Sequence, residues 1–256
     1  MFRRINGLGL LTMVVVLGLW EVLVRSGVLD FQNLPAPSAV TARAQELVAS
    51  GELVVNLLHT VRVTLLGWLI ASLVGVALGL VLGLWRPAWR WSMASLEMLR
   101  AVPPISLVPL ALLVFGFSIR TELTLIIYAS AWPVLINTIE GVRTVQQELH
   151  DVARMLRLSR VETLRKIVLP AALPSIVVGL QLSLSLALVL AVVAELVGNP
   201  SGLGNGLILA QLALRPEEMF VYVFTIGLLG IVLNAAFRQV ASRALVSASR
   251  GQGGEP

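Results

Sequence analysis

The sequence predicts an all-α fold, a polytopic transmembrane helical bundle of about six spans, and three observations support this class. Apolar residues make up 57% of the 256 residues and charged residues only 13%, and the mean hydropathy of +0.89 lies outside the range of soluble domains. The apolar residues form runs of about 20 residues, which is the length that a helix needs to cross a bilayer. Arginines gather at the ends of those runs, as positive-inside topology requires. We therefore expect one transmembrane domain over 1–256 and no separate soluble one.

The six spans have approximate boundaries that follow from the apolar runs. They are expected at 8–24, 63–85, 101–117, 123–139, 171–198 and 219–237. The first follows Arg3 and Arg4 without a small-x-small cleavage site, so we interpret it as an uncleaved span. Residues 39–58 are patterned as an amphipathic helix on the outer surface, and residues 199–206 as a loop.

Two spans carry features that predict how they pack. Gly75, Gly79 and Gly83 recur every fourth residue, so they lie on one helix face and permit a close approach by another helix. The run 101–117 contains three prolines, each of which removes a backbone donor, so a broken or bent span is expected there.

The longest polar segment, 143–170, lies between the fourth and fifth spans and is rich in arginine. If this segment lies on the same side of the membrane as both chain termini, most basic residues are on that side. The positive-inside rule then predicts that both termini and this segment are cytoplasmic. Ser159 and Glu162 have capping-box spacing for a helix, which should end before Pro170. The segment is either a solvated anchor that binds anionic membrane lipid or a docking element for a soluble partner.

At this segment the sequence resembles the "EAA" signature of ABC-importer permeases, Glu-Ala-Ala-x3-Gly-x9-Ile-x-Leu-Pro, in register throughout. Asp151 stands at the Glu position, Val152 at the first Ala and Arg157 at the Gly of the turn. Glycine takes a positive φ at little cost, whereas arginine does not. The residues that the resemblance implies in ATPase coupling are Asp151, Val152, Ala153, Arg157, Leu158, Ile167, Leu169 and Pro170.

The resemblance extends over nearly the whole chain and is closest to the sulfonate, taurine and nitrate import group. Stretches at 34–38, 99–104, 132–137 and 201–204 occur in the same order in that group. It implies the type I ABC-importer permease fold in a bacterial inner membrane and a homodimer that moves a small solute, an organic or inorganic anion, into the cytoplasm. It also implies two partners, a cytoplasmic ABC ATPase dimer and a periplasmic or lipid-anchored substrate-binding protein. A pyrimidine precursor or a bicarbonate-like anion is an alternative substrate.

The chain itself lacks a nucleotide site. A P-loop needs Gly-x4-Gly-Lys-Ser/Thr, and the only lysine, Lys166, precedes Ile167. We therefore expect ATP and Mg²⁺ on a separate ATPase chain, with no enzymatic activity and no cofactor here. The absence of cysteine excludes thiol catalysis, and His59 and His150 are not spaced as a metal pair, so no metal site is predicted. The net charge of +5 follows the span ends rather than a nucleic-acid surface.

Polar residues within the spans are the candidates for the pathway between two copies, which the resemblance places along the inner spans. Asn137, Gln181, Ser183 and Ser185 would line it if they face inward, and Glu195 is the candidate for an outer gate. As nucleophiles the two serines would need a base nearby, and the span supplies none, so a helix-packing role is preferred to a catalytic one. The other hypotheses are a membrane scaffold with a basic docking loop and an ion-coupled carrier, which would need acidic relays within the spans.

Overall fold

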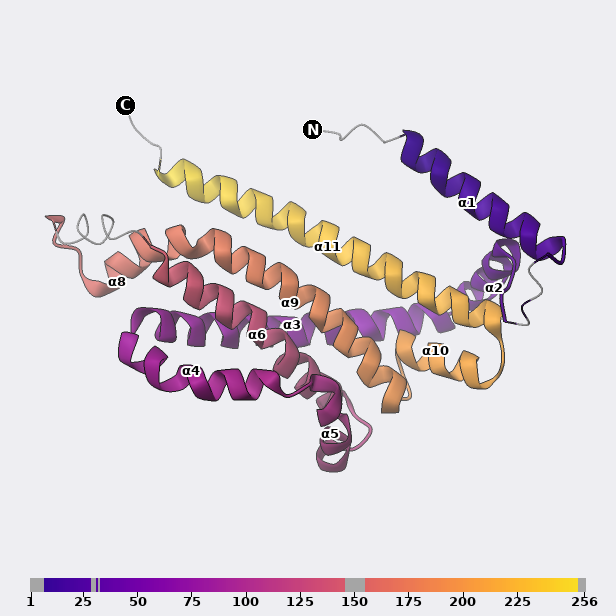
Figure 1. The fold of residues 1–256 in the computed structure, drawn as a ribbon, viewed down its shortest axis with the longest axis horizontal. Coiled ribbons are helices and arrows are strands. Elements are labelled where there is room, and N and C mark those ends of the chain that lie inside the picture. The colour runs from indigo at the N-terminus through magenta and orange to yellow at the C-terminus, as the bar shows by residue number, and fades with distance from the viewer. Residues whose placement is uncertain (1–6, 29–30, 32, 146–154, 253–256) are drawn as a thin grey trace.

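The computed structural model describes residues 7–28, 31, 33–145 and 155–252, and every regular element in these ranges is helical. Long helices lie side by side along the molecule, and the shorter ones lie at its ends and on one side (Figure 1). The elements are α1 (Gly7–Arg25), α2 (Pro37–Ala49), α3 (Glu52–Leu84), α4 (Arg86–Ala101), η1 (Pro104–Leu107), α5 (Val108–Phe115), α6 (Ile119–Arg143), α8 (Arg160–Thr163), η2 (Leu164–Val168), α9 (Leu169–Gly198), α10 (Leu203–Leu212) and α11 (Pro216–Gln252).

The expected set of spans agrees broadly with these helices. By length and composition, four helices among the described residues could each cross a membrane, over Glu52–Leu84, Ile119–Arg143, Arg160–Gly198 and Pro216–Arg243. A fifth crossing is counted if α4 and the η1–α5 segment, bent by 78°, form one broken span. The first expected span, 8–24, falls within α1, which is 19 residues long but is not among these candidate spans.

The third predicted span differs most from its expected boundaries. The chain turns at Val102 and Pro103, whose ψ angles of 119° and 126° are extended. The run 101–117 therefore contributes only η1 and α5, and α4 supplies the other arm of the bent pair. The expected break in this apolar run is present, and the bent pair is either a broken span or a re-entrant loop. The run 101–117 is not a complete span by itself, because Pro103 and Pro104 interrupt the helix near its start.

Helix boundaries on one side of the molecule also depart from the prediction. The expected surface helix 39–58 divides at Gly51, whose φ of 80° ends the helical path, so residues from Glu52 onward belong to α3. The expected loop 199–206 is shorter, since α10 begins at Leu203. The capping of α10 by a distant side chain, described below, accounts for the helix that local sequence did not predict.

The prediction that a helix ends before Pro170 is wrong. Helix continues from α8 through η2 into α9, and η2 is a π-helical turn over Leu164–Val168. The wider π turn changes the hydrogen-bond pairing next to a residue that has no N–H, so the proline is accommodated without a break.

The core of the bundle is α6, which packs between α3 and α9. The glycine face of α3 lies against α6, as the four-residue spacing predicted. A Cβ at Gly75 would lie 2.7 Å from the Cβ of Val134, and one at Gly79 would lie 2.5 Å from the Cβ of Thr138. These two helix backbones are therefore closer than any larger residue on that face would allow.

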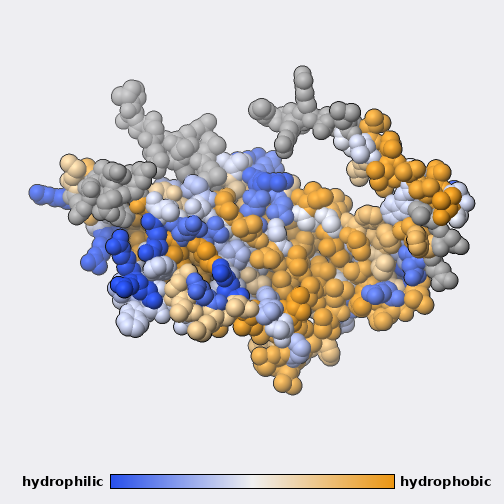
Figure 2. Space-filling view, in the orientation of Figure 1, coloured by the Kyte–Doolittle hydropathy of each residue, from blue (hydrophilic) through white to orange (hydrophobic). Residues whose placement is uncertain are grey.

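The two ends of the bundle differ in charge. Hydrophilic side chains gather where α4, α6 and α8 meet, whereas apolar side chains cover the middle of the molecule (Figure 2). We call the first region the basic end, and it includes Arg86, Arg90, Arg143, Arg160 and Arg165. The opposite end carries α2, α10 and the first turns of α3 and α11 (Figure 1).

Replacing Gly79 with alanine should destabilise the bundle by about 1–3 kcal/mol, because the new methyl group overlaps Thr138 and the backbone carbonyl of Leu135. The thermal unfolding midpoint of the purified protein in detergent measures the effect.

The matched control is Gly227→Ala in α11, where a Cβ would meet no atom within 4 Å. That variant should be as stable as the wild type or slightly more stable, because alanine has the higher helix propensity. If the two variants lost the same amount of thermal stability, the close approach of α3 and α6 would be contradicted.

Candidate coupling and pathway sites

The turn of the EAA-like segment takes the left-handed conformation despite its arginine. Met155 is helical, Leu156 and Arg157 form a turn, and the φ of Arg157 is 49°. Glycine reaches this region without a Cβ clash, whereas arginine takes it at a cost of about 1–2 kcal/mol. Asp151, Val152 and Ala153, the other residues assigned to the start of the signature, lie outside the described residues.

The helix after this turn begins as the sequence predicts. Ser159 Oγ accepts a hydrogen bond from the Glu162 backbone N–H at 3.3 Å, and Glu162 Oε2 accepts one from the Ser159 backbone N–H at 3.0 Å. This reciprocal pair is a complete capping box. Lys166 Nζ lies 3.2 Å from Glu162 Oε1 one turn later, which adds an exposed ion pair.

Three apolar side chains in and beside this turn are exposed, two before Arg157 and one in α8. Met155 is 83% exposed, Leu156 65% and Val161 72%. We call these three residues the coupling tip. They lie at the basic end, among charged side chains, so contact with lipid tails does not account for their exposure.

The later residues of the signature are not exposed like the coupling tip but pack against the helix bundle. Leu158, Ile167, Leu169 and Pro170 are each half-buried. Between them Val168 is 2% exposed and packs in a cluster with Val142 of α6 and with Ala172 and Ile176 of α9. The segment is therefore fixed to α6 and continuous with α9.

Among the predicted pathway residues, Ser183 has a packing role. It is fully buried, and its Oγ donates to the Ser130 carbonyl of α6 at 2.7 Å. Asn137 is half-buried, and its Nδ2 donates to the Pro133 carbonyl at 2.8 Å.

Two other pathway candidates are more open to the surroundings. Gln181 is half-buried and Ser185 is exposed. The Nδ2 of Asn234 in α11 lies 3.2 Å from Ser185 Oγ. The structure thus brings Ser185 together with Asn234, which the sequence reasoning did not select, because nothing in spacing relates residues 49 positions apart.

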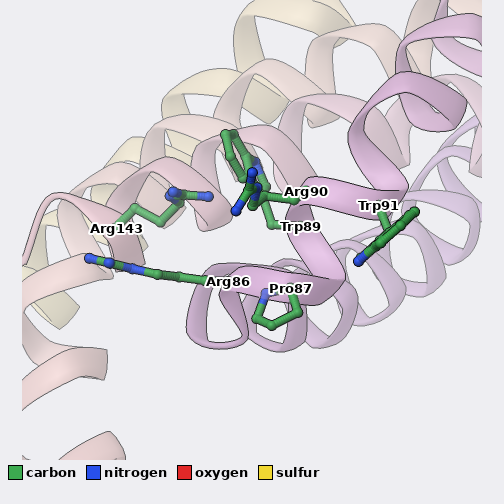
Figure 3. A pocket seen from close by; sticks show the side chains of 6 residues that line it. All are labelled: Arg86, Pro87, Trp89, Arg90, Trp91 and Arg143. Carbon is green, nitrogen blue, oxygen red and sulfur yellow. The ribbon is translucent and has the colours of Figure 1, made fainter.

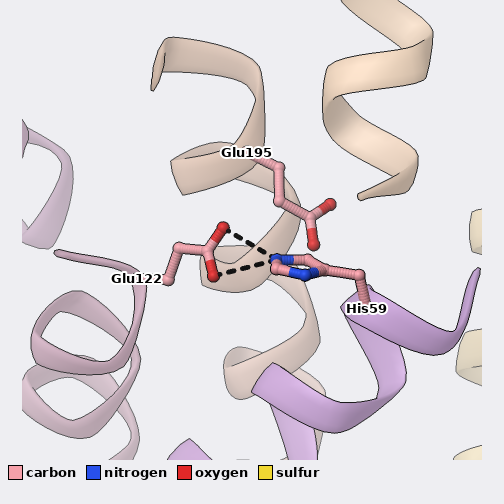
Figure 4. Close-up of side chains that lie close together, drawn as sticks. All are labelled: His59, Glu122 and Glu195. Atoms are coloured by element: carbon pink, nitrogen blue, oxygen red, sulfur yellow. Dashed lines mark hydrogen bonds and ion pairs between the residues drawn. The ribbon is translucent and has the colours of Figure 1, made fainter. Parts of the chain in front are cut away.

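The candidate gate residue Glu195 lies in a buried polar cluster with His59 and Glu122, neither of which the sequence assigned to a gate or pathway. Its carboxylate accepts from Thr60 Oγ1 at 2.8 Å and from the Gly204 backbone N–H at 2.9 Å. The second contact caps the start of α10. Beside it, His59 Nε2 lies 3.2 Å from both oxygens of Glu122 (Figure 4). This cluster joins the first turns of α3 and α6 to the last turn of α9.

A basic cavity of about 680 Å³ opens at the other end of the molecule. Arg86, Arg90 and Arg143 line it together with tryptophans of α4 (Figure 3). The Arg143 guanidinium lies 3.6 Å from the ring centroid of Trp89, a cation–π contact. No ion pair with a carboxylate involves these three arginines among the described residues.

Comparison with known proteins gives a family match over most of the chain. Residues 72–245 match the family described as "Binding-protein-dependent transport system inner membrane component". The chain is 33% identical over 237 residues to the putative aliphatic sulfonates transport permease protein SsuC of Bacillus subtilis, which covers 93% of this chain and 86% of that one. It is 34% identical over 215 residues to the protein of the same description from Escherichia coli, covering 84% and 82%.

A third relative is named for a different substrate. The nitrate import permease protein NrtB of Leptolyngbya laminosa is 29% identical over 177 residues, covering 69% of this chain and 63% of that one. Among solved structures, an inward-facing MetNI methionine ABC transporter chain superimposes with a TM-score of 0.62 at 18% identity, covering 78% and 97%. At that identity the likeness concerns the fold.

Replacing Arg157 with glycine should stabilise the turn by about 1 kcal/mol, because the cost of a side chain in the left-handed region disappears. Hydrogen–deuterium exchange over residues 155–163 should show slower exchange in this variant.

The paired control is Arg160→Gly, at the first helical position of α8. Here glycine should speed exchange over the same residues, because it lowers helix propensity by about 1 kcal/mol. If both glycines had the same effect, the left-handed turn at Arg157 would be wrong.

Proposed function

Because the chain belongs to the family of binding-protein-dependent transport system inner membrane components, we propose that it works as one half of a homodimeric anion importer driven by a separate ATPase. The chain is a permease subunit of an ABC importer, as its relatives are. The family description includes a substrate-binding protein, and the type of transporter includes an ATPase. The proposal concerns how this chain engages them and what it carries.

The observation that carries the proposal is the coupling tip. Exposed apolar side chains framed by charged ones are typical of a protein interface. Met155, Leu156 and Val161 fit this description at the basic end of the bundle. We assign the tip, with Asp151, Val152 and Ala153 before it, to the groove of the ATPase subunit, where ATP and Mg²⁺ are held.

Movement of the tip would reach the pathway through continuous helix. The segment from Arg160 to Gly198 has no break in its helical path. Val168 packs against Val142, so α6 moves with it. A displacement imposed at the tip by the ATPase would therefore tilt α6 and α9 together, because packed helices shift as rigid elements.

The proposed orientation rests on the distribution of charges. We place the basic end and both termini in the cytoplasm, since arginines concentrate on that side of a membrane protein. The substrate-binding protein would then meet the opposite end, where α2 and α10 lie (Figure 1). The cavity of Arg86, Arg90 and Arg143 would face the inner leaflet, where anionic lipid headgroups supply the missing negative charge.

For the substrate we propose a small anion of the sulfonate or nitrate kind. The support is the substrates for which the relatives are named, together with the polar side chains on α9 and α11 that are not fully buried. Ser185 and Asn234 offer a hydroxyl and an amide. These uncharged groups can donate hydrogen bonds to the oxygens of an anion without binding it as tightly as a charged group would. The homodimer would bring two copies of this pair to the pathway.

Replacing Val161 with aspartate should reduce retention of the ATPase roughly ten-fold, because burying a carboxylate in an apolar groove is unfavourable. Quantitative co-purification of the ATPase with the tagged permease measures this.

The matched control is Val28→Asp, since Val28 is 71% exposed and Val161 is 72% exposed. Val28 follows α1 near the opposite end, so the control should retain the ATPase as the wild type does. Equal retention by Val161→Asp and by the wild type would overturn the docking assignment.

Reconstituted vesicles containing the permease, the ATPase and the binding protein should accumulate a radiolabelled alkanesulfonate or nitrate only when ATP is supplied. Uptake driven by an ion gradient without the ATPase would support a secondary carrier instead. No uptake of any tested anion in a complex that hydrolyses ATP would contradict the substrate class.

A further inference from the structure

We propose that His59, Glu122 and Glu195 form a site for a divalent transition-metal ion, with Zn²⁺ as the best match. One ligand atom from each residue can be chosen so that all three lie within 4.8 Å of one another. The side chains converge from three helices, as Figure 4 shows. One imidazole nitrogen and two carboxylate oxygens are a ligand set that zinc accepts, with water at the remaining position.

The charge balance of the cluster supports a cation. Glu122 is 1% exposed and Glu195 is fully buried. Two buried carboxylates beside a single imidazole leave a deficit of positive charge, and an uncompensated buried charge is costly. Thr60 and Asn199 donate hydrogen bonds to these carboxylates but carry no charge. A divalent ion would neutralise both carboxylates at once.

The surroundings orient the ligands before any ion arrives. Thr60 Oγ1 and the Gly204 backbone N–H hold the Glu195 carboxylate, at 2.8 and 2.9 Å. Thr60 Oγ1 is itself fixed, since it accepts from the Leu203 backbone N–H at 2.9 Å. Outer hydrogen bonds of this kind hold metal ligands in position. Asn199 Nδ2 lies 3.4 Å from His59 Nε2, and this amide would have to turn away when the nitrogen coordinates.

The site has an approach from solvent and a mechanical consequence. The His59 side chain is 22% exposed, whereas that of Glu122 is 2% exposed, so the histidine forms the open side. A bound ion would connect the first turns of α3 and α6 to the last turn of α9. Because Glu195 also caps α10, the ion would tie four helices at the end opposite the coupling tip.

The test uses the full permease assembled with its ATPase in nanodiscs, first treated with a chelator. Zn²⁺ titrated by calorimetry should bind at about one equivalent per permease chain and should raise the thermal unfolding midpoint. His59→Gln should weaken this binding at least about 100-fold, because glutamine keeps a hydrogen-bonding group but loses the imidazole ligand. His150→Gln, at the chain's other histidine, is the control and should bind as the wild type does.

Two outcomes would overturn the site. Wild type and His59→Gln could bind Zn²⁺ equally weakly, which would mean that a shared proton, and not a metal ion, balances the two carboxylates. Alternatively, His150→Gln could lose as much binding as His59→Gln, which would place the ion elsewhere.

A second measurement does not depend on whether the variants fold. Co²⁺ added to the wild type should produce visible absorption bands of a low-coordinate site with nitrogen and oxygen ligands, and excess Zn²⁺ should remove them. A spectrum identical to that of aqueous Co²⁺ would refute the proposal. Neither measurement requires transport, so failure here would leave the importer function untouched.

Discussion

The whole structure depends on the close packing of α6 between α3 and α9. In a membrane the lipid tails are as apolar as the helix surfaces, so helices associate through close van der Waals contact and interhelical hydrogen bonds. Small residues make this possible on both sides of α6. Gly79 of α3 leaves room for Thr138, and Gly179 of α9 leaves room for Asn137. A Cβ added at Gly179 would lie only 2.8 Å from the Cβ of Asn137. The Ser183–Ser130 hydrogen bond then fixes the rotation of α9.

This packed unit has distinct chemistry at its two ends. At the basic end, three apolar side chains are exposed around a left-handed turn and the capped start of a continuous helix. At the opposite end, carboxylates and a histidine from the same three helices come together beneath α10. A force applied at one end and a ligand bound at the other would therefore act on the same set of helices, which is what coupling between distant sites requires.

Three prolines and Arg157 show how much of the backbone conformation local sequence predicts. Pro103 and Pro104 break a helix as expected, whereas Pro170 does not, because the preceding residues adopt a π turn. The turn at Arg157 keeps the positive φ that glycine would allow, although arginine is unfavourable there. In each case the residue type correctly predicts that the conformation is unfavourable. Whether the chain nevertheless adopts it depends on the surrounding packing.

The sequence by itself determined the features that depend on composition and short spacing. These are the apolar spans, the charge difference between the ends, the glycine face of α3 and the capping box at Ser159. Only the tertiary structure decided which distant residues meet. His59 and Glu122 are 63 positions apart, and Ser183 and Ser130 are 53 apart. Such contacts depend on the rotation and depth of each helix in the bundle, and periodicity along one helix carries no information about its neighbour's rotation.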